Sequence, residues 1–483
     1  MEFRPLLYAL GIMIMLLGGA MVPCAVIDIF GRRTEWPVFA VSSFAALVIG
    51  LCLYILARGD PPRTGQREAF LLTVLVWLIL PLFAALPFLA SDLSFTYAVF
   101  ESVSGLTTTG STVLTGLDSL PPGLLLWRAI LQWIGGIGII VTAIAILPQL
   151  RVGGMQLFNL ESSDQASRFF ARVSDIATSV GLVYVGLTVL CALLYANSGL
   201  EPFQAVTHAM TTMAAGGYST HDASFGQYQG TAAPWVAIVF MSIAGLPFSL
   251  LATAIRTGRV DILLRSPELR LYFMLIVMFT AALVAYQTLA DPDRFASTGL
   301  AVRNTLFNVI SVMTGTGYAL GDYGAWGGPP EAAFLILTFL GGCAGSAACG
   351  IKMFRIELSA KAVLAHAQKM VMRRRLAPVR YQGRTVSEDV LQSVMVFVFL
   401  YLTTFLTAAT LLSLTGLDPI TAISGAATSV SNVGPGLGPT IGPNGTFQTL
   451  PDAAKWVCAG AMLLGRLEFV PVFAILTRRF WTA

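Results

Sequence analysis

Four short polar stretches in this 483-residue chain each end in glycine, and their residue types suit the coordination of an ion. They read TTTG, AAGG, TGTG and SNVG, and they end at Gly110, Gly217, Gly317 and Gly434. Small residues and glycine let a backbone turn its carbonyl groups inward, and a ring of carbonyls can replace the hydration shell of an ion. We call residues 107–110, 214–217, 314–317 and 431–434 the glycine loops.

The glycine loops contain no Asp or Glu, which narrows the class of ion. Neutral dipoles favour a large, weakly hydrated monovalent cation, because Ca²⁺ and Mg²⁺ are usually bound by carboxylates. We expect the last three residues of each loop to bind this cation: Thr108, Thr109, Gly110; Ala215, Gly216, Gly217; Gly315, Thr316, Gly317; and Asn432, Val433, Gly434. The alternative, four unrelated turns at helix ends, does not explain why the loops recur in register.

The residues before each glycine form an internal repeat. Up to and including the glycine they read YAVFESVSGLTTTG, QAVTHAMTTMAAGG, NTLFNVISVMTGTG and TAISGAATSVSNVG, and the glycines lie 107, 100 and 117 residues apart. Such a segment is too short to cross a membrane, so it predicts a re-entrant half-helix surrounded by protein or a water-filled cavity. The C-terminal end of a half-helix is partly negative and favours a cation. Asp418–Pro419 and Glu201–Pro202 are typical helix starts.

The composition is that of a polytopic membrane protein: 56% of the residues are hydrophobic and 11% are charged, against about 25% charged in soluble domains. Runs of the length that a bilayer requires occur at 6–30, 37–57, 69–90, 124–149, 176–196, 232–255, 270–290, 331–357, 390–414 and 453–477. The last eight runs form pairs, and each pair brackets one glycine loop. The sequence therefore predicts an all-α polytopic membrane protein with four span–half-helix–loop–span repeats around a central pore, plus two extra N-terminal spans.

The repeats give predicted unit boundaries and a predicted orientation. The units are two N-terminal helices (1–66) and pore repeats at 67–172, 173–268, 269–385 and 386–483. Ten spans place both termini on one side together with most of the 29 Lys and Arg, although Arg32 and Arg33 run against this bias. The positive-inside rule then predicts a multi-pass membrane protein with both termini cytoplasmic. The basic segment 355–389 is either an anchor near anionic lipid or a docking surface for a partner.

Several classes of site find no support in the sequence. The six cysteines are scattered and do not form a disulfide framework. The three histidines lack metal-ligand spacing, and no cluster of acids, histidines and cysteines at membrane depth suggests an enzyme. The chain has neither a P-loop nor a convincing dinucleotide fingerprint after a strand. Any control by nucleotide must therefore come from another protein.

Two further features lie within predicted spans. The stretch GGCAGSAACGIK, residues 341–352, interrupts the eighth run; its small residues either pack closely between helices or line a cavity. Arg466 lies in the last run, where a charge is costly and suggests function, unless its side chain extends to the inner interface. Glu468 is only two residues away, so it points to another helix face and should not pair with Arg466. We expect carbonyls of residues 341–350 to contact Arg466 instead.

The glycine loops and their flanks resemble those of the Trk/Ktr/HKT superfamily of potassium transporters. The stretches that carry the resemblance are FESVSGLTTTGST (100–112), TTMAAGGYST (211–220), SVMTGTGYA (311–319) and SVSNVGPGLG (429–438). The two extra N-terminal spans are more similar to the bacterial TrkH/TrkG-type membrane subunit than to the shorter Ktr type. The resemblance implies a pseudo-four-fold pore with one filter glycine per repeat, K⁺ as the transported ion and no cofactor. Glycine at the first filter position implies preference for potassium over sodium.

The resemblance also implies a gate and partners. An intramembrane loop below the filter would obstruct the pore, which assigns gating to Gly341, Gly342, Gly345, Ser346, Gly350, Lys352 and Arg466. The implied partners are a second copy of the chain in a homodimer, the membrane lipid and a cytoplasmic NAD- or ATP-binding regulatory subunit. No nucleic acid is expected as a partner.

The function that we expect is channel-like potassium uptake across the bacterial inner membrane by a protein that is not an enzyme. A proton- or sodium-coupled potassium symporter remains open. A secondary transporter of a small solute would show inverted repeats, whereas these repeats run in one direction.

Overall fold

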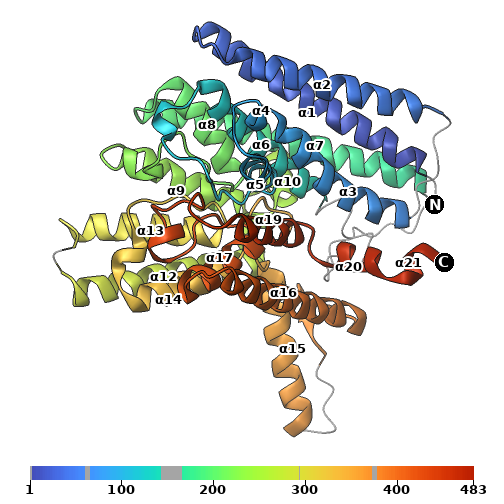
Figure 1. Cartoon of the computed structure of the whole chain (residues 1–483). Coiled ribbons are helices and arrows are strands. Elements are labelled where there is room, and N and C mark those ends of the chain that lie inside the picture. Colours follow the sequence, from blue (N-terminus) through green and yellow to red (C-terminus); the bar gives the residue numbers. More distant parts are fainter. Residues whose placement is uncertain (1–2, 60–65, 143–165, 293, 372–377, 483) are drawn as a thin grey trace.

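The computed structural model describes residues 3–59, 66–142, 166–292, 294–371 and 378–482, and these residues are mostly helical (Figure 1). The four repeats each supply a first span, a half-helix and a second span. These are α3 (Gln66–Ala84), α5 (Phe95–Leu106) and α6 (Pro122–Val141); α7 (Ala166–Asn197), α8 (Pro202–Met213) and α9 (Ala233–Ala244); α12 (Pro267–Ala290), α13 (Thr298–Met313) and α14 (Gly328–Phe339); α16 (Glu388–Leu414), α17 (Pro419–Ser431) and α19 (Asp452–Arg466).

Shorter elements connect these helices. They are α4 (Leu86–Leu89), η1 (Leu117–Ser119), η4 (Ser224–Tyr228), α10 (Phe248–Thr257), α11 (Asp261–Arg265), η5 (Tyr323–Trp326), α15 (Met353–Val371), α18 (Gly438–Ile441), α20 (Val470–Leu476) and α21 (Arg478–Thr482). An antiparallel hairpin of β1 (Arg380–Tyr381) and β2 (Arg384–Thr385) follows α15. The sequence analysis did not predict this hairpin, because two-residue strands leave no alternating pattern.

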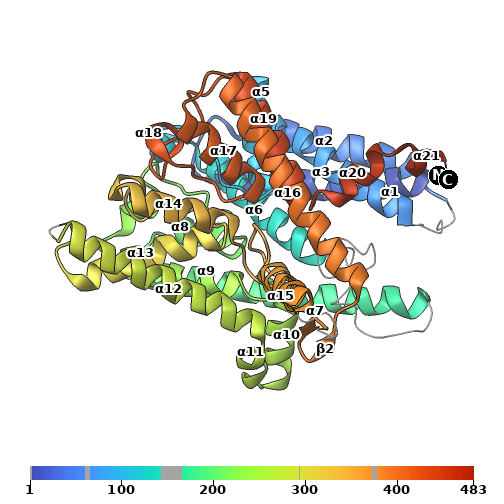
Figure 2. The same ribbon diagram turned by 90° about the horizontal axis from the view of Figure 1, so that it is seen from below.

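The helices close into a ring. Each half-helix packs against both spans of its own repeat. The second span of each repeat also packs against the half-helix of the next repeat: α6 on α8, α9 on α13, α14 on α17, and α19 on α5. The last of these contacts returns to the first repeat (Figure 2). Because every half-helix is held by three neighbours, its inner end is fixed within the protein and its backbone is shielded from lipid.

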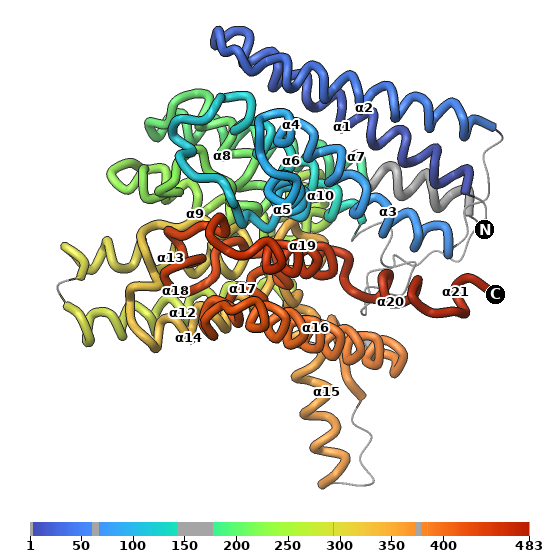
Figure 3. Tube along the Cα trace, viewed as in Figure 1, coloured from blue at the N-terminus to red at the C-terminus, as the bar shows by residue number. Residues whose placement is uncertain are grey.

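The two N-terminal helices, α1 (Arg4–Phe30) and α2 (Trp36–Leu56), lie outside this ring. They pack against each other, and α1 contacts α3 and α6 (Figure 1). The outer sides expose large apolar residues such as Leu16, Val41 and Phe44, as expected of helices in lipid. The start of α1 and the end of α21 lie at the same end of the molecule (Figure 3), where Leu6 and Phe480 share a cluster with Leu71.

Two of the predicted spans are sharply bent rather than straight. Among the described residues, seven helices are long and apolar enough to cross a membrane, or up to nine if each bent pair counts as one. The bends are 99° between α9 and α10 and 104° between α19 and α20. Pro247 cannot continue the first helix, and left-handed φ angles at Glu468 and Phe469 end the second.

The predicted run 331–357 is likewise not one helix, because residues 340–352 are non-helical between α14 and α15. The end of the predicted run 124–149 and residues 372–377 of the basic segment lie outside the described residues. The unit boundaries drawn from the repeats stay predictions.

Candidate functional site

The four half-helices end at the four glycine loops. Ser94, Ser297 and Asp418 cap α5, α13 and α17, each accepting a backbone N–H three residues on, which confirms the predicted cap at Asp418. The predicted helix start at Glu201–Pro202 is confirmed, since Glu201 is the N-cap and Pro202 begins α8, although the Glu201 side chain makes no capping hydrogen bond. The last carbonyls of each half-helix, which carry partial negative charge, lie beside a glycine loop. This arrangement favours a cation there.

The glycine loops share one backbone conformation despite their different sequences. In each loop the final glycine and the residue two before it have left-handed φ angles. The pairs are Thr108 and Gly110 (52° and 86°), Ala215 and Gly217 (51° and 74°), Gly315 and Gly317 (74° and 76°), and Asn432 and Gly434 (54° and 110°). Left-handed φ is costly for Thr and Ala, so the surrounding fold must hold them in this conformation. An alternation of left- and right-handed residues brings successive carbonyls to one side of a chain.

The loops also meet each other in a closed ring. A Cβ atom added to each final glycine would collide with the carbonyl oxygen of the residue before the final glycine in the next loop. The pairs are Gly110 with Gly216, Gly217 with Thr316, Gly317 with Val433, and Gly434 with Thr109, at 2.2, 1.8, 1.9 and 2.8 Å. The order runs through repeats one, two, three, four and back to one. All twelve predicted filter residues therefore lie in one ring, in which glycine is required by close approach as well as by φ.

Side chains join the fourth loop to the first. Asn432 Nδ2 donates to Thr109 Oγ1 at 2.8 Å, and Ser111 Oγ donates to the Gly434 carbonyl at 2.8 Å. Thr109 is also hydrogen bonded to Thr107 at 2.7 Å. These bonds close the ring where the two ends of the repeat array meet.

Gln132 braces the second loop and was missed by the sequence analysis. Its Nε2 donates to the Gly216 carbonyl at 2.6 Å, and its Oε1 accepts the Tyr218 N–H at 3.0 Å. The Gly216 carbonyl keeps a second lone pair, so this bond does not exclude an ion. A signal for Gln132 was present: it lies four residues after Arg128, so an otherwise apolar span has one polar face.

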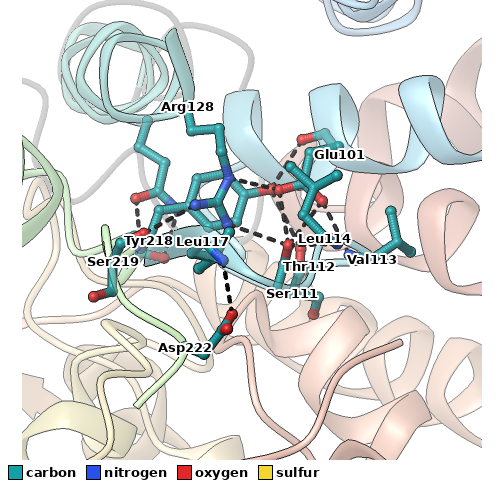
Figure 4. A network of polar contacts seen from close by, with 12 residues as sticks. Glu101, Ser111, Thr112, Val113, Leu114, Leu117, Arg128, Tyr218, Ser219 and Asp222 are labelled. Atoms are coloured by element: carbon teal, nitrogen blue, oxygen red, sulfur yellow. Dashed lines mark hydrogen bonds and ion pairs between the residues drawn. The ribbon is translucent and has the colours of Figure 1, made fainter. Parts of the chain in front are cut away.

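A buried ion pair lies beside the first two loops (Figure 4). Arg128 Nε and Glu101 Oε1 are 2.8 Å apart, and both side chains are almost fully buried. Arg128 also donates to the Ser219 carbonyl at 2.9 Å and lies over the Tyr218 ring, 4.0 Å from its centroid. Tyr218 in turn donates to the Glu101 carbonyl at 2.9 Å. The pair thus ties the segment after the first glycine loop to that after the second.

The other repeats use neutral groups at similar places. Glu101 Oε2 accepts the backbone N–H three residues after the first filter glycine, at Val113. Asn308 and Ser424 accept the corresponding N–H groups in the third and fourth repeats, at 3.0 and 2.9 Å. His208 instead contacts Ser219 Oγ at 3.1 Å. A side chain of each half-helix therefore holds the chain that leaves its own loop.

Outside the membrane spans, acidic groups join the same two repeats. Asp222 accepts the backbone N–H groups of Gly116 and Leu117 at 3.0 and 3.1 Å. Asp118 is hydrogen bonded to His221, and this bond lowers the pKa of the Asp118 carboxyl. These contacts fix the outer connections of the first and second repeats to each other.

Replacing Glu101 with Ala is expected to destabilise the protein by about 3–5 kcal/mol, because it leaves the Arg128 charge buried without its partner. Thermal unfolding of the detergent-solubilised protein measures the loss. Replacing Asp291 with Ala breaks an exposed ion pair with Arg294 and serves as the control, which should cost about 1 kcal/mol or less. Adding Arg128→Met to Glu101→Ala should recover part of the loss. If Glu101→Ala and Asp291→Ala lowered the unfolding temperature equally, this account would be contradicted.

The 341–350 loop lies directly beneath the glycine loops. The Cys349 N–H donates to the Thr314 carbonyl at 3.3 Å, and the Gly350 N–H donates to the Ser431 carbonyl at 3.1 Å. These carbonyls lie at the inner ends of α13 and α17. Thr108 Oγ1 of the first loop is 3.7 Å from Cys349 Sγ. The loop therefore lies against the inner ends of two half-helices and against the first glycine loop.

Glycine is needed where the 341–350 loop folds back on itself. A Cβ on Gly341 would lie 2.0 Å from the Cys349 carbonyl, and a Cβ on Gly342 would lie 2.6 Å from the Ala348 Cβ. Gly350 has a left-handed φ of 72°. These steric demands, rather than helix packing through small residues, explain the composition of the stretch.

Arg466 reaches the loop from the end of α19, but not in the way predicted. Its Nη1 donates to Cys349 Sγ at 2.8 Å and its Nη2 donates to the Gly135 carbonyl at 3.2 Å, so its partners are a thiol and an α6 carbonyl rather than loop carbonyls. It lies at the break between two helices and not in mid-span. Glu468 pairs with Arg355 at 2.5 Å, so the prediction that it would not pair with Arg466 is confirmed.

Lys352 and Arg466 bring two positive charges to one small cavity below the ring. Both are buried, and among the described residues neither forms an ion pair with a carboxylate. The cavity is also lined by Cys349, Asn432 and the Arg355–Glu468 pair. A cation leaving the ring would meet these charges at close range.

The remaining residues assigned to the gate lie further from the ring. Gly345 accepts the Phe248 N–H at 3.0 Å, and Ser346 Oγ donates to the Cys343 carbonyl at 2.6 Å. The first bond anchors the loop to the bend between α9 and α10, and the second lies within the loop and shapes it.

Comparison with known proteins agrees with this geometry. The TrkH family model, described as a cation transport protein, matches residues 37–480. The Trk system potassium uptake protein TrkI of Halomonas elongata is 41% identical, over 99% of this chain and 97% of the relative. TrkH of Escherichia coli K12 is 34% identical over the full length of both proteins. The crystal structure of the potassium transporter TrkH from Vibrio parahaemolyticus superposes with a TM-score of 0.91 at 32% identity, covering both chains fully.

The match extends over nearly the whole chain, including both N-terminal helices and the four repeats. These relatives are named as transport proteins, so the family is one of transporters rather than enzymes. In the part of the chain that the structure describes, no group of three or more His, Cys, Asp or Glu is arranged to hold a metal ion. The chain is an integral membrane protein and belongs to the TrkH family of cation transport proteins.

Proposed function

We propose that this chain takes up potassium ions through the ring of glycine loops, as the membrane subunit of a Trk-type system in the bacterial inner membrane. The observation that carries the proposal is the closed contact of the four loops, each with two left-handed residues. A ring of neutral oxygens at the negative ends of four half-helices suits a large monovalent cation. The full-length relatives named as potassium uptake proteins support potassium as that cation.

The 341–350 loop is the gate in this proposal. Two observations support this role. Hydrogen bonds attach the loop to the inner ends of α13 and α17, and the positive charges of Lys352 and Arg466 lie beside it. The conformation described is then the closed one. The membrane potential drives cations inward at about 2.3 kcal/mol per charge per 100 mV, so an open pore needs no other energy source.

We also propose a homodimer and a cytoplasmic NAD- or ATP-binding regulatory subunit as partners, with both termini cytoplasmic. Helix α15 supports a docking role, because it extends away from the ring of helices (Figure 1) and exposes Val363, Leu364, Met370 and Val371. An exposed apolar surface on a basic helix suits a protein partner as well as the lipid surface. Mass measurement of the detergent-solubilised protein tests the dimer directly.

The test of the proposed function is ion uptake by the purified protein in liposomes. We expect potassium to enter under an imposed potential alone, and sodium to enter more slowly. Uptake that requires a proton or sodium gradient would favour the symporter instead. Equal uptake of potassium and sodium would contradict the role of the ring as a potassium filter. Protein-free liposomes measure the background.

A further inference from the structure

Beneath the ring, the 341–350 loop rests on two segments, one from the second repeat and one from the third. The bend between α9 and α10 accepts two of its N–H groups: Cys343 donates to the Gly245 carbonyl at 2.9 Å, and Ala347 donates to the Ala244 carbonyl at 3.1 Å. In return the Phe248 N–H donates to the Gly345 carbonyl at 3.0 Å. We call residues 244–248 with the first two turns of α12 the seat of the loop.

One acidic side chain in the seat binds the loop directly. Glu268, in the first turn of α12, accepts the Ala344 N–H at 2.6 Å. Glu268 is 2% exposed. A hydrogen bond between buried groups is costly to lose, because the partner that remains is left unsatisfied in the interior.

The two parts of the seat are fixed to each other through α12. Tyr272 lies one turn after Glu268, so both side chains are on the same helix face. The Tyr272 hydroxyl would be 2.6 Å from a Cβ atom on Gly245, which places it against the bend. The same face of α12 therefore contacts the bend and the loop. A displacement of the start of α12 would withdraw Glu268 from the Ala344 N–H.

We propose that Glu268 is a positioning residue that holds the 341–350 loop in its closed place, by its hydrogen bond to the Ala344 N–H. The inference rests on the proposed gate and adds the element that controls it. Opening of the loop breaks this hydrogen bond. The short connection that contains α11 links the two parts of the seat and is exposed, so a partner that pulls on it reaches the loop through Glu268.

The test measures potassium flux through the full-length protein in liposomes without any regulatory partner. Glu268→Ala leaves the buried Ala344 N–H without its acceptor, which is expected to raise the resting flux about tenfold. Glu268→Gln keeps an oxygen that can accept the Ala344 N–H, so its flux should lie between those of the parent and the Ala variant. The potassium-to-sodium ratio should not change, because the ring is untouched.

Glu357→Ala is the matched control. Glu357 is also an acid on the same side of the protein and is largely buried, but it pairs with Lys361 at 2.5 Å within α15. Its replacement should leave the resting flux unchanged. A rise as large as that of Glu268→Ala would overturn the inference, since loss of any nearby acid would then suffice.

A second readout follows the loop itself. Cys52 is the one exposed cysteine of the six, so a Cys52→Ser background leaves only buried thiols. In this background Glu268→Ala should speed alkylation of Cys343 and Cys349, mapped by mass spectrometry of peptides. Unchanged flux and unchanged alkylation would overturn the role of Glu268. If Arg466→Ala also left the flux unchanged, the proposed gate itself would be wrong, and the two failures are thereby distinguished.

Discussion

Gly110→Ser is expected to lower potassium uptake about tenfold or more and to reduce the preference for potassium over sodium. Gly110 has a φ of 86°, and a Cβ atom there would lie 2.2 Å from the Gly216 carbonyl. Since the neighbour is backbone rather than a flexible side chain, the second loop must move and the ring must widen. Uptake of each ion by the variant in liposomes measures both effects.

The control for this variant is Gly199→Ser. Gly199 also has a left-handed φ, 101°, but a Cβ atom there would meet nothing within 4 Å. This substitution therefore carries the backbone strain of a non-glycine residue, about 1–2 kcal/mol, without any contact to the ring. It should reduce stability slightly and leave selectivity as in the parent. A parent-like ion preference in Gly110→Ser would refute the assignment of the ring as the filter.

Arg466→Ala is expected to raise the resting potassium flux about tenfold or more, because the charge that opposes a cation below the ring is removed. At an effective dielectric constant of about 20, two unit charges about 6 Å apart repel by about 3 kcal/mol, or about a hundredfold in rate. The loss of the contact with Cys349 also frees one side of the 341–350 loop. Flux into liposomes under a fixed potential measures the change.

Arg466→Lys is the matched control because it keeps the charge and removes the planar guanidinium. Its flux should stay near that of the parent, since electrostatic repulsion is retained. If instead Arg466→Ala lowered the flux, Arg466 would be a structural residue, and the barrier would have to lie in the 341–350 loop alone. Equal increases in both variants would assign the effect to the lost hydrogen bonds and not to the charge.

The repeat and its final glycines could be predicted from the sequence, because the local geometry requires glycine at the end of every copy. Thr108, Ala215 and Asn432 share a left-handed conformation with Gly315. The sequence does not predict this conformation at the three non-glycine positions. That conformation is imposed by the neighbouring loops. The order in which the loops touch, with Gly434 returning to Thr109, likewise depends on how α19 packs against α5.

Residues that act across repeats were the hardest to find from sequence. Glu268 reads as an ordinary acid in the first turn of a helix, and only the fold brings Ala344, 76 residues later, to its carboxylate. Arg466 was found because a charge in an apolar run is costly wherever it lies. Its partners, Cys349 and Gly135, were not found, because the sharp end of α19 redirects the side chain.

The sequence by itself therefore determined the membrane class, the fourfold repeat, the glycines that end the four loops and the interrupted stretch at 341–350. These are properties of composition, period and local steric demand, which each segment carries alone. The tertiary structure decided the closure of the ring and the contacts of Glu268 and Arg466 with the loop. These depend on segments about 75 to 330 residues apart, whose meeting is set by the packing of buried side chains and not by any local pattern.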